Sequence, residues 1–84
     1  MTYEQCYEVV RDAVQRVLIA RTVRPETQIY GPQADMDSLN MVEAIVGIEE
    51  SLQADYGLYV NVEVGSLAGT VTVADLAQHV YEML

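Results

Sequence analysis

The sequence predicts an all-α fold, a small bundle of three to four helices, and three observations support it. The chain has 84 residues, which suits one domain with a modest core. Hydrophobic residues make up 51% of it, enough for a globular fold. Apolar residues recur at helical spacing in three segments, each preceded by a residue that can cap a helix. We therefore expect a single domain that spans residues 1–84.

The first helix is expected from about Tyr3 to Ala20. Thr2, followed three residues later by Gln5, has the pattern of a capping box. At about 100° per residue, one face is apolar and consists of Tyr3, Cys6, Val10, Ala13, Val14 and Val17. The opposite face is polar and consists of Glu4, Glu8, Asp12 and Gln15.

A long loop between the first two helices, residues 21–37, is expected because Pro25 cannot continue a helix. Loops of this length are uncommon in small domains and tend to be functional. Ile29 and Tyr30 are predicted to hold the loop against the core, and Gly31-Pro32 to form a turn.

The central helix is predicted to begin at Ser38, with Asp37 as its N-cap, and to end near Leu52. Its core face consists of Met41, Ala44, Ile45, Ile48 and Leu52. The opposite face mixes apolar and acidic residues, and we call it the docking stripe: Leu39, Val42, Glu43, Val46 and Glu50, with Glu49 at its margin. A helix that buries only one face should be polar on the opposite face, where the docking stripe lies.

Burial of the docking stripe under the long loop is the alternative explanation. It does not account for the glutamates, because unpaired carboxylates are too costly to bury and no basic residue follows Arg24. An apolar stripe edged with acids suits transient docking, in which the acids guide a partner and the aliphatic side chains pack against it. The stripe is therefore predicted to be a partner-binding surface.

The last helix is predicted from about Val73 to Met83, with Thr72 and Asp75 as its capping box. Its apolar positions are Val73, Leu76, Ala77, Val80, Tyr81 and Leu84. Between Gln53 and Val71 the pattern is weaker. A short helical turn from Asn61 through Leu67 is favoured over a strand across residues 58–62, because a single strand would have no partner.

The charge of the chain restricts its partners. The formal net charge is −9, all four arginines precede Pro25, and ten acids follow it. Such a surface repels nucleic acid and steers a basic protein partner toward it. No apolar run is long enough for a membrane span, and the N-terminal stretch lacks the basic cluster of a targeting peptide. A cytoplasmic monomer that binds neither nucleic acid nor membrane is expected, and the single Cys6 fits a reducing compartment.

Catalysis by the chain itself is not expected. The stretch DMDSLN begins like a calcium loop, but the required glycine and closing glutamate are missing, since Asn40 and Val46 stand there. A serine hydrolase needs a general base, and the only histidine, His79, projects opposite the apolar face of the last helix and is predicted to be solvated. Cys6 lies on a core face and is predicted to be packed rather than reactive.

Asp37-Ser38-Leu39, at the start of an acidic second helix and after a long loop, resembles the acyl carrier proteins. In that family the serine of the D-S-L motif receives 4′-phosphopantetheine. The following LNMVEAIVGIEESL is similar to the family's recognition helix, and TVADLAQHVYEM to its closing helix, so the likeness covers most of the chain.

The resemblance implies a bundle of acyl-carrier type and a discrete carrier, not an enzyme. Ser38 would be the attachment residue for phosphopantetheine taken from coenzyme A, with Asp37 as its acidic neighbour. The docking stripe would contact a phosphopantetheinyl transferase and acyl-loading and synthase enzymes that carry basic patches. The chain departs from the family at Asp35, where a glycine is common, and at Asn40, where an acid is frequent.

Two alternatives remain. Peptidyl carriers tend to have glycine-glycine-histidine or glycine-glycine-aspartate before the serine, so Asp35-Met36-Asp37 favours an acyl carrier over an aminoacyl or peptidyl one. A helical interaction module without a prosthetic group is the alternative from another class.

Overall fold

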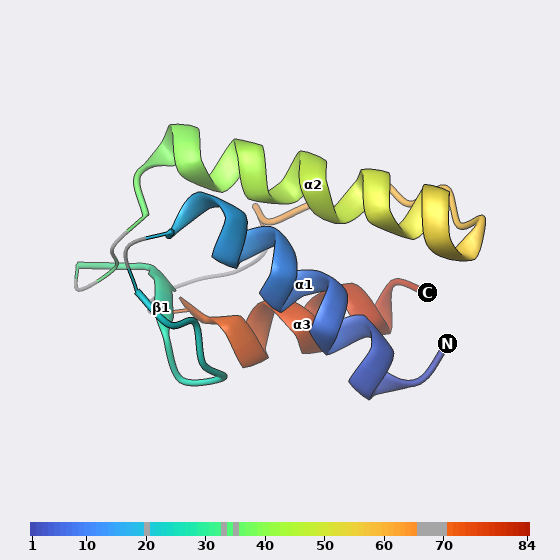
Figure 1. Ribbon diagram of the computed structural model, residues 1–84, viewed down its shortest axis with the longest axis horizontal. Coiled ribbons are helices and arrows are strands. Elements are labelled where there is room, and N and C mark those ends of the chain that lie inside the picture. Colours follow the sequence, from blue (N-terminus) through green and yellow to red (C-terminus); the bar gives the residue numbers. More distant parts are fainter. Residues whose placement is uncertain (20, 33, 35, 66–70) are drawn as a thin grey trace.

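The computed structural model describes residues 1–19, 21–32, 34, 36–65 and 71–84. Its elements are α1 (Tyr3–Val17), β1 (Gln28–Tyr30), α2 (Ser38–Tyr56), β2 (Val71–Thr72) and α3 (Val73–Glu82). The prediction of a small helical bundle is confirmed (Figure 1). The all-α class needs one correction, because β1 and β2 pair as a short antiparallel sheet.

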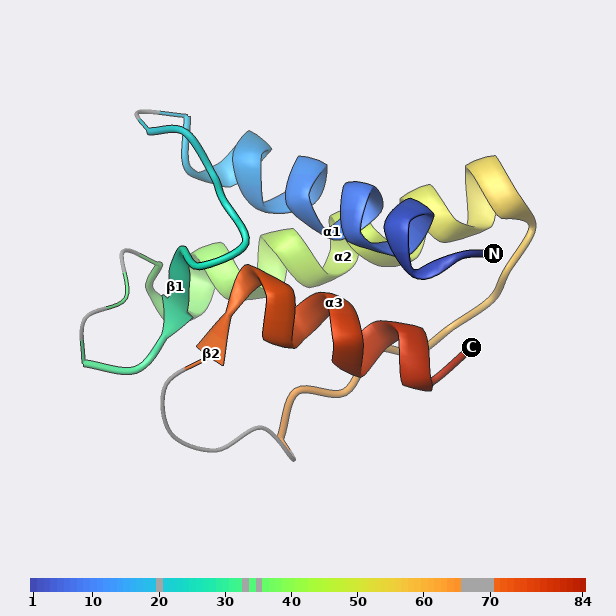
Figure 2. The ribbon, with the colours of Figure 1, turned by 90° about the horizontal axis from the view of Figure 1, so that it is seen from below.

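Helices α2 and α3 both pack against α1 (Figure 2). The short sheet lies at the end of the bundle where α2 begins, and both chain termini lie at the opposite end. The start of α2 is therefore bordered by the α1–α2 loop and by the sheet.

Each helix begins with a capping box, in which the cap and the third helical residue exchange side-chain hydrogen bonds to each other's backbone N–H groups. The pairs are Thr2 with Gln5, Asp37 with Asn40, and Thr72 with Asp75. Two helix ends differ from prediction. The α1 helix stops at Val17, before the predicted Ala20, which lies outside the described residues. The α2 helix continues past Leu52 to Tyr56 and ends at Gly57, whose φ of 65° is left-handed.

The predicted loop 21–37 contains β1, which the sequence did not reveal. Gln28 pairs with Thr72 and Tyr30 with Val71. Ile29 is buried as predicted, but Tyr30 is 54% exposed, because successive residues of a strand point to opposite faces. The prediction that Tyr30 packs in the core was therefore wrong.

The loop between α1 and α2 is held by hydrogen bonds to α3 and to α1. The carbonyls of Pro25 and Thr27 accept hydrogen bonds from the backbone N–H groups of Ala74 and Val73, at 2.9 and 3.0 Å, in the first turn of α3. These donors have no partner within the helix, so the loop satisfies them.

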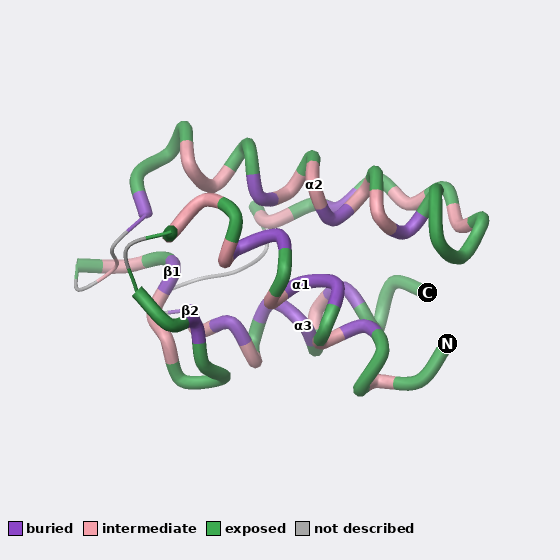
Figure 3. Tube along the Cα trace, in the orientation of Figure 1, coloured by how far each residue is buried: buried purple, intermediate pink, exposed green. Residues whose placement is uncertain are grey.

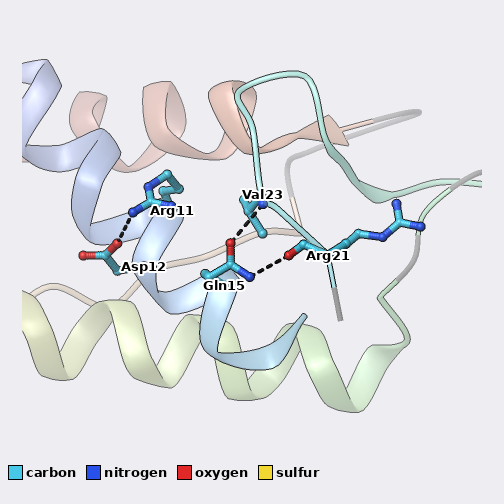
Figure 4. Close-up of polar contacts among 5 residues, drawn as sticks. All are labelled: Arg11, Asp12, Gln15, Arg21 and Val23. Atoms are coloured by element: carbon cyan, nitrogen blue, oxygen red, sulfur yellow. Dashed lines mark hydrogen bonds and ion pairs between the residues drawn. The ribbon is translucent and has the colours of Figure 1, made fainter. Parts of the chain in front are cut away.

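On the other side, Gln15 of α1 binds the beginning of the loop (Figure 4). Its side-chain Nε2 donates to the carbonyls of Leu18 and Arg21, at 2.9 and 2.7 Å, and its Oε1 accepts from the backbone N–H of Val23, at 2.9 Å. The helical pattern predicted Gln15 on the polar outer face of the first helix. In the structure its side chain instead ties the beginning of the loop to α1.

Residues 57–65 form neither the short helical turn nor the strand considered from the sequence. Both predictions were wrong over this range, and Leu67 lies outside the described residues. The segment is held to the helices by two polar contacts. The backbone N–H of Val62 donates to a carboxylate oxygen of Glu49, at 2.8 Å, and a ring nitrogen of His79 contacts the carbonyl oxygen of Glu63.

The core lies between the three helices (Figure 3). Eleven predicted positions are buried: Cys6, Val10, Ala13, Val14, Ala44, Ile48, Leu52, Val73, Leu76, Ala77 and Val80. Tyr3, Val17, Met41 and Ile45 are partly buried. Tyr81 and Leu84 are exposed, contrary to prediction. Leu84 lies beyond the end of α3 at Glu82, and Tyr81 meets Tyr3 edge to face near the surface, with ring centroids 5.8 Å apart. Val9, Val23, Met36, Val62 and Val71 complete the core without having been predicted.

Candidate functional site

Ser38 is the first residue of α2, and it is exposed. The cap of the helix is Asp37, whose carboxylate accepts a hydrogen bond from the backbone N–H of Asn40 at 2.7 Å. Among the described residues, the hydroxyl of Ser38 has no hydrogen-bond partner. Capping therefore does not explain the serine, because its neighbour already performs that role.

The amide oxygen Oδ1 of Asn40 accepts a longer hydrogen bond from the backbone N–H of Asp37, at 3.5 Å. Asn40, which stands where carrier proteins frequently have an acid, thus has a structural role, because its side-chain amide completes the capping box. Asp35, the other departure, lies outside the described residues.

An apolar groove of about 530 Å³ opens beside Ser38. Its walls include Ile29, Tyr30, Met36, Met41 and Val42, from the loop, β1 and α2. The sequence did not predict this groove. Met36 is buried between two acidic positions and belongs to no helical pattern, so only the tertiary structure reveals its role.

A second, smaller cavity of about 160 Å³ lies beside the groove and is bordered by α3. The two share Ile29, Tyr30 and Met41, and the second also reaches Val64 and Leu76. The groove and the cavity are therefore neighbours, with Ile29, Tyr30 and Met41 between them.

The docking stripe is exposed along most of its length. Leu39, Val42 and Val46 are 66%, 59% and 44% exposed, which is unusual for three aliphatic residues on one helix face. Glu43 and Glu50 are also exposed, and they lie on the same face. The structure thus places these five predicted residues together on an open surface.

Glu49, at the margin of the stripe, differs from the others. It is partly buried, and one carboxylate oxygen binds the backbone N–H of Val62. It was predicted as a docking residue, and its observed contact is structural: it holds the segment after α2 against that helix.

The remaining reactive side chains are occupied elsewhere. Cys6 is buried, as predicted; its thiol donates to the carbonyl of Ala77, and burial raises the pKa of the thiol above its ordinary value of 9.0. His79 is partly buried rather than fully solvated, because its ring contacts the carbonyl of Glu63. The described residues bring together no group of three histidine, cysteine or acidic side chains that could hold a metal ion.

In the part of the chain that the structure describes, none of the helices has the length and apolarity that a membrane crossing requires. The chain matches no protein-family model, no curated protein and no solved structure.

Proposed function

We propose that this protein is a discrete acyl carrier protein. In this proposal Ser38 carries a 4′-phosphopantetheine arm, and the thiol of the arm holds acyl intermediates as thioesters in fatty-acid, polyketide or related biosynthesis. The observation that carries the proposal is an exposed serine with an unengaged hydroxyl at the start of α2, in the sequence Asp37-Ser38-Leu39.

Attachment of the arm would be catalysed by a phosphopantetheinyl transferase. The Ser38 oxygen attacks the phosphorus that bears the pantetheine in coenzyme A, the pyrophosphate bond breaks, and 3′,5′-ADP leaves. The serine proton passes to a base of the transferase, which also supplies the metal ion. The carrier therefore needs only an accessible hydroxyl.

The start of α2 suits the added phosphate. Its backbone N–H groups and helix dipole favour negative charge, and the first turn contains no acidic residue. Asp37 opposes the phosphate in part, but its carboxylate already accepts the hydrogen bond from Asn40.

The docking stripe supports transfer between several enzymes. Its exposed aliphatic residues offer a small apolar contact, and the acids around it steer a basic patch by long-range attraction. Such contacts release readily, because they bury little surface. The tether then supplies a high effective concentration of the cargo at each active site.

The groove beside Ser38 favours an acyl cargo over an aminoacyl or peptidyl one. Its walls are largely apolar, with Asp37 and Ser38 as the polar residues, so an alkyl chain at this end of α2 gains by leaving water. The interaction module remains the alternative if Ser38 accepts no group.

Intact mass spectrometry tests the proposal directly. The protein is incubated with coenzyme A, magnesium and a broad-specificity phosphopantetheinyl transferase. We expect a gain of one phosphopantetheinyl group, lost in Ser38→Ala and retained in the matched control Ser51→Ala, a serine farther along α2. Circular dichroism establishes that each variant is folded. No gain in folded wild-type protein would reject the carrier and leave the interaction module.

A further inference from the structure

Tyr59 is an exposed aromatic residue beyond the end of α2 that the proposed carrier function does not use. It follows the cap Gly57 by two residues, and 83% of it is open to solvent. An aromatic ring presents a large apolar area at low entropic cost, so a ring left in water is suited to binding.

Two hollows border this ring, of about 370 and 310 Å³. Tyr59 and Gln53 line both of them. The first also contains Glu49 and the second Glu50, so each hollow combines the tyrosine ring with a carboxylate. No basic residue lines either hollow.

The end of α2 adds a third source of negative potential. Its last turn contains no basic residue, and the N–H groups of Gly57 and Leu58 satisfy only the carbonyls of Gln53 and Leu52. The carbonyls at the C-terminus of a helix carry partial negative charge, which attracts a cation. The ring, the two carboxylates and the helix end all favour a positively charged ligand.

We propose that Tyr59, Glu49 and Glu50 form an arginine-binding cradle, through which a basic protein partner docks at the end of α2 remote from Ser38. A guanidinium group stacks on an aromatic face and binds a carboxylate through two parallel N–H donors, whereas an ammonium group offers only a point charge. The exposed Glu50 has both oxygens available for such a pair, whereas Glu49 offers one oxygen, because Val62 engages the other.

The cradle extends the docking stripe beyond Glu50, so it deepens the proposed carrier function by naming a contact on the partner. Its test is separate from that function, because arginine binding needs no group on Ser38. A failure to load the serine would leave the test unchanged, and a failure of the cradle would leave loading unchanged.

The experiment is a titration of the unmodified, isotope-labelled protein, followed by NMR at low ionic strength. The probe is a blocked pentapeptide that alternates alanine and arginine, and the control is the same peptide with lysine in place of arginine. The variants are Tyr59→Ala and Tyr59→Phe, with Tyr56→Ala as the matched control, since Tyr56 lies in the last turn of α2 but lines neither hollow.

We expect the arginine peptide to shift the signals of Gln53, Glu50 and Tyr59, and to bind more tightly than the lysine peptide. Tyr59→Ala should weaken its binding about threefold to tenfold, while Tyr59→Phe and Tyr56→Ala change it less than about twofold. Equal binding of the two peptides, or unchanged binding to Tyr59→Ala, would overturn the cradle. Because Tyr59 is largely exposed, we expect both of its variants to fold, and circular dichroism checks the folding of all three.

Discussion

Glu49 and Glu50 are adjacent on α2 but have different environments, and replacing each by alanine should separate their roles. Glu49 is partly buried and binds the backbone N–H of Val62 at 2.8 Å, whereas Glu50 is exposed. A hydrogen bond to a charged group contributes about 1.5–3 kcal/mol to stability. Because this one is only partly buried, we expect Glu49→Ala to lower the free energy of unfolding by about 2 kcal/mol.

Glu50→Ala removes the same charge and makes the same change in helix propensity. Relief of repulsion on a surface of net charge −9 therefore affects both variants alike, and it cancels in the difference between them. Glu50→Ala alone should change the free energy of unfolding by less than about 0.5 kcal/mol. A small domain is stable by about 5–10 kcal/mol, so the expected difference between Glu49→Ala and Glu50→Ala is a substantial share of the total stability.

Urea denaturation followed by circular dichroism measures both free energies, and hydrogen exchange reports on the Val62 amide. Glu49→Ala should remove the protection of that amide, while Glu49→Gln, which keeps an acceptor, should retain part of it. Equal stabilities of the two alanine variants, or continued protection of the Val62 amide in Glu49→Ala, would refute the assignment of Glu49 as a tether.

Three further predictions concern stability. Gln15→Ala removes three hydrogen bonds at the beginning of the loop, and urea denaturation should show a loss of about 2–3 kcal/mol in the free energy of unfolding. The control Gln78→Ala, at an exposed position of α3, should cost less than about 0.5 kcal/mol. Equal losses in the two variants would contradict the role of Gln15 as a tether. Burial raises the pKa of the Cys6 thiol on folding, so the contribution of the neutral thiol to stability is complete below pH 9.0 and is lost as the pH rises through the raised pKa. The free energy of unfolding should therefore fall less steeply above pH 9.0 in Cys6→Ala than in the wild type. Parallel curves of stability against pH would argue against this. Added salt should raise the melting temperature by screening the unbalanced acids, and a constant melting temperature would show that repulsion is weak.

The helices and their starts could be predicted because their causes are local. A capping box occupies four consecutive residues, and the apolar spacing of α1, α2 and α3 is visible within each segment. The exposed docking stripe could also be predicted, since Leu39, Val42 and Val46 lie opposite the core face.

The sheet could not be predicted in the same way. Strands of two or three residues are too short to show an alternating pattern, and β1 exists because β2 pairs with it from the other side of α2 in the sequence. The roles of Gln15 and Glu49 depend on backbone groups brought to them by the fold. For the same reason the sequence did not predict the groove beside Ser38, whose walls come from the loop, β1 and α2.

The pairing of β1 with β2 has a consequence for the order in which the molecule assembles. Contacts between distant residues form only after the chain between them has been closed into a loop, at an entropic cost. The helices α1 and α2 can form from local contacts, whereas β1 has no partner until α3 has docked and brought Val71 and Thr72 with it. Segments with few contacts of their own also exchange their amide hydrogens through local opening. We therefore expect the end of the molecule that presents Ser38 to form last and to open first.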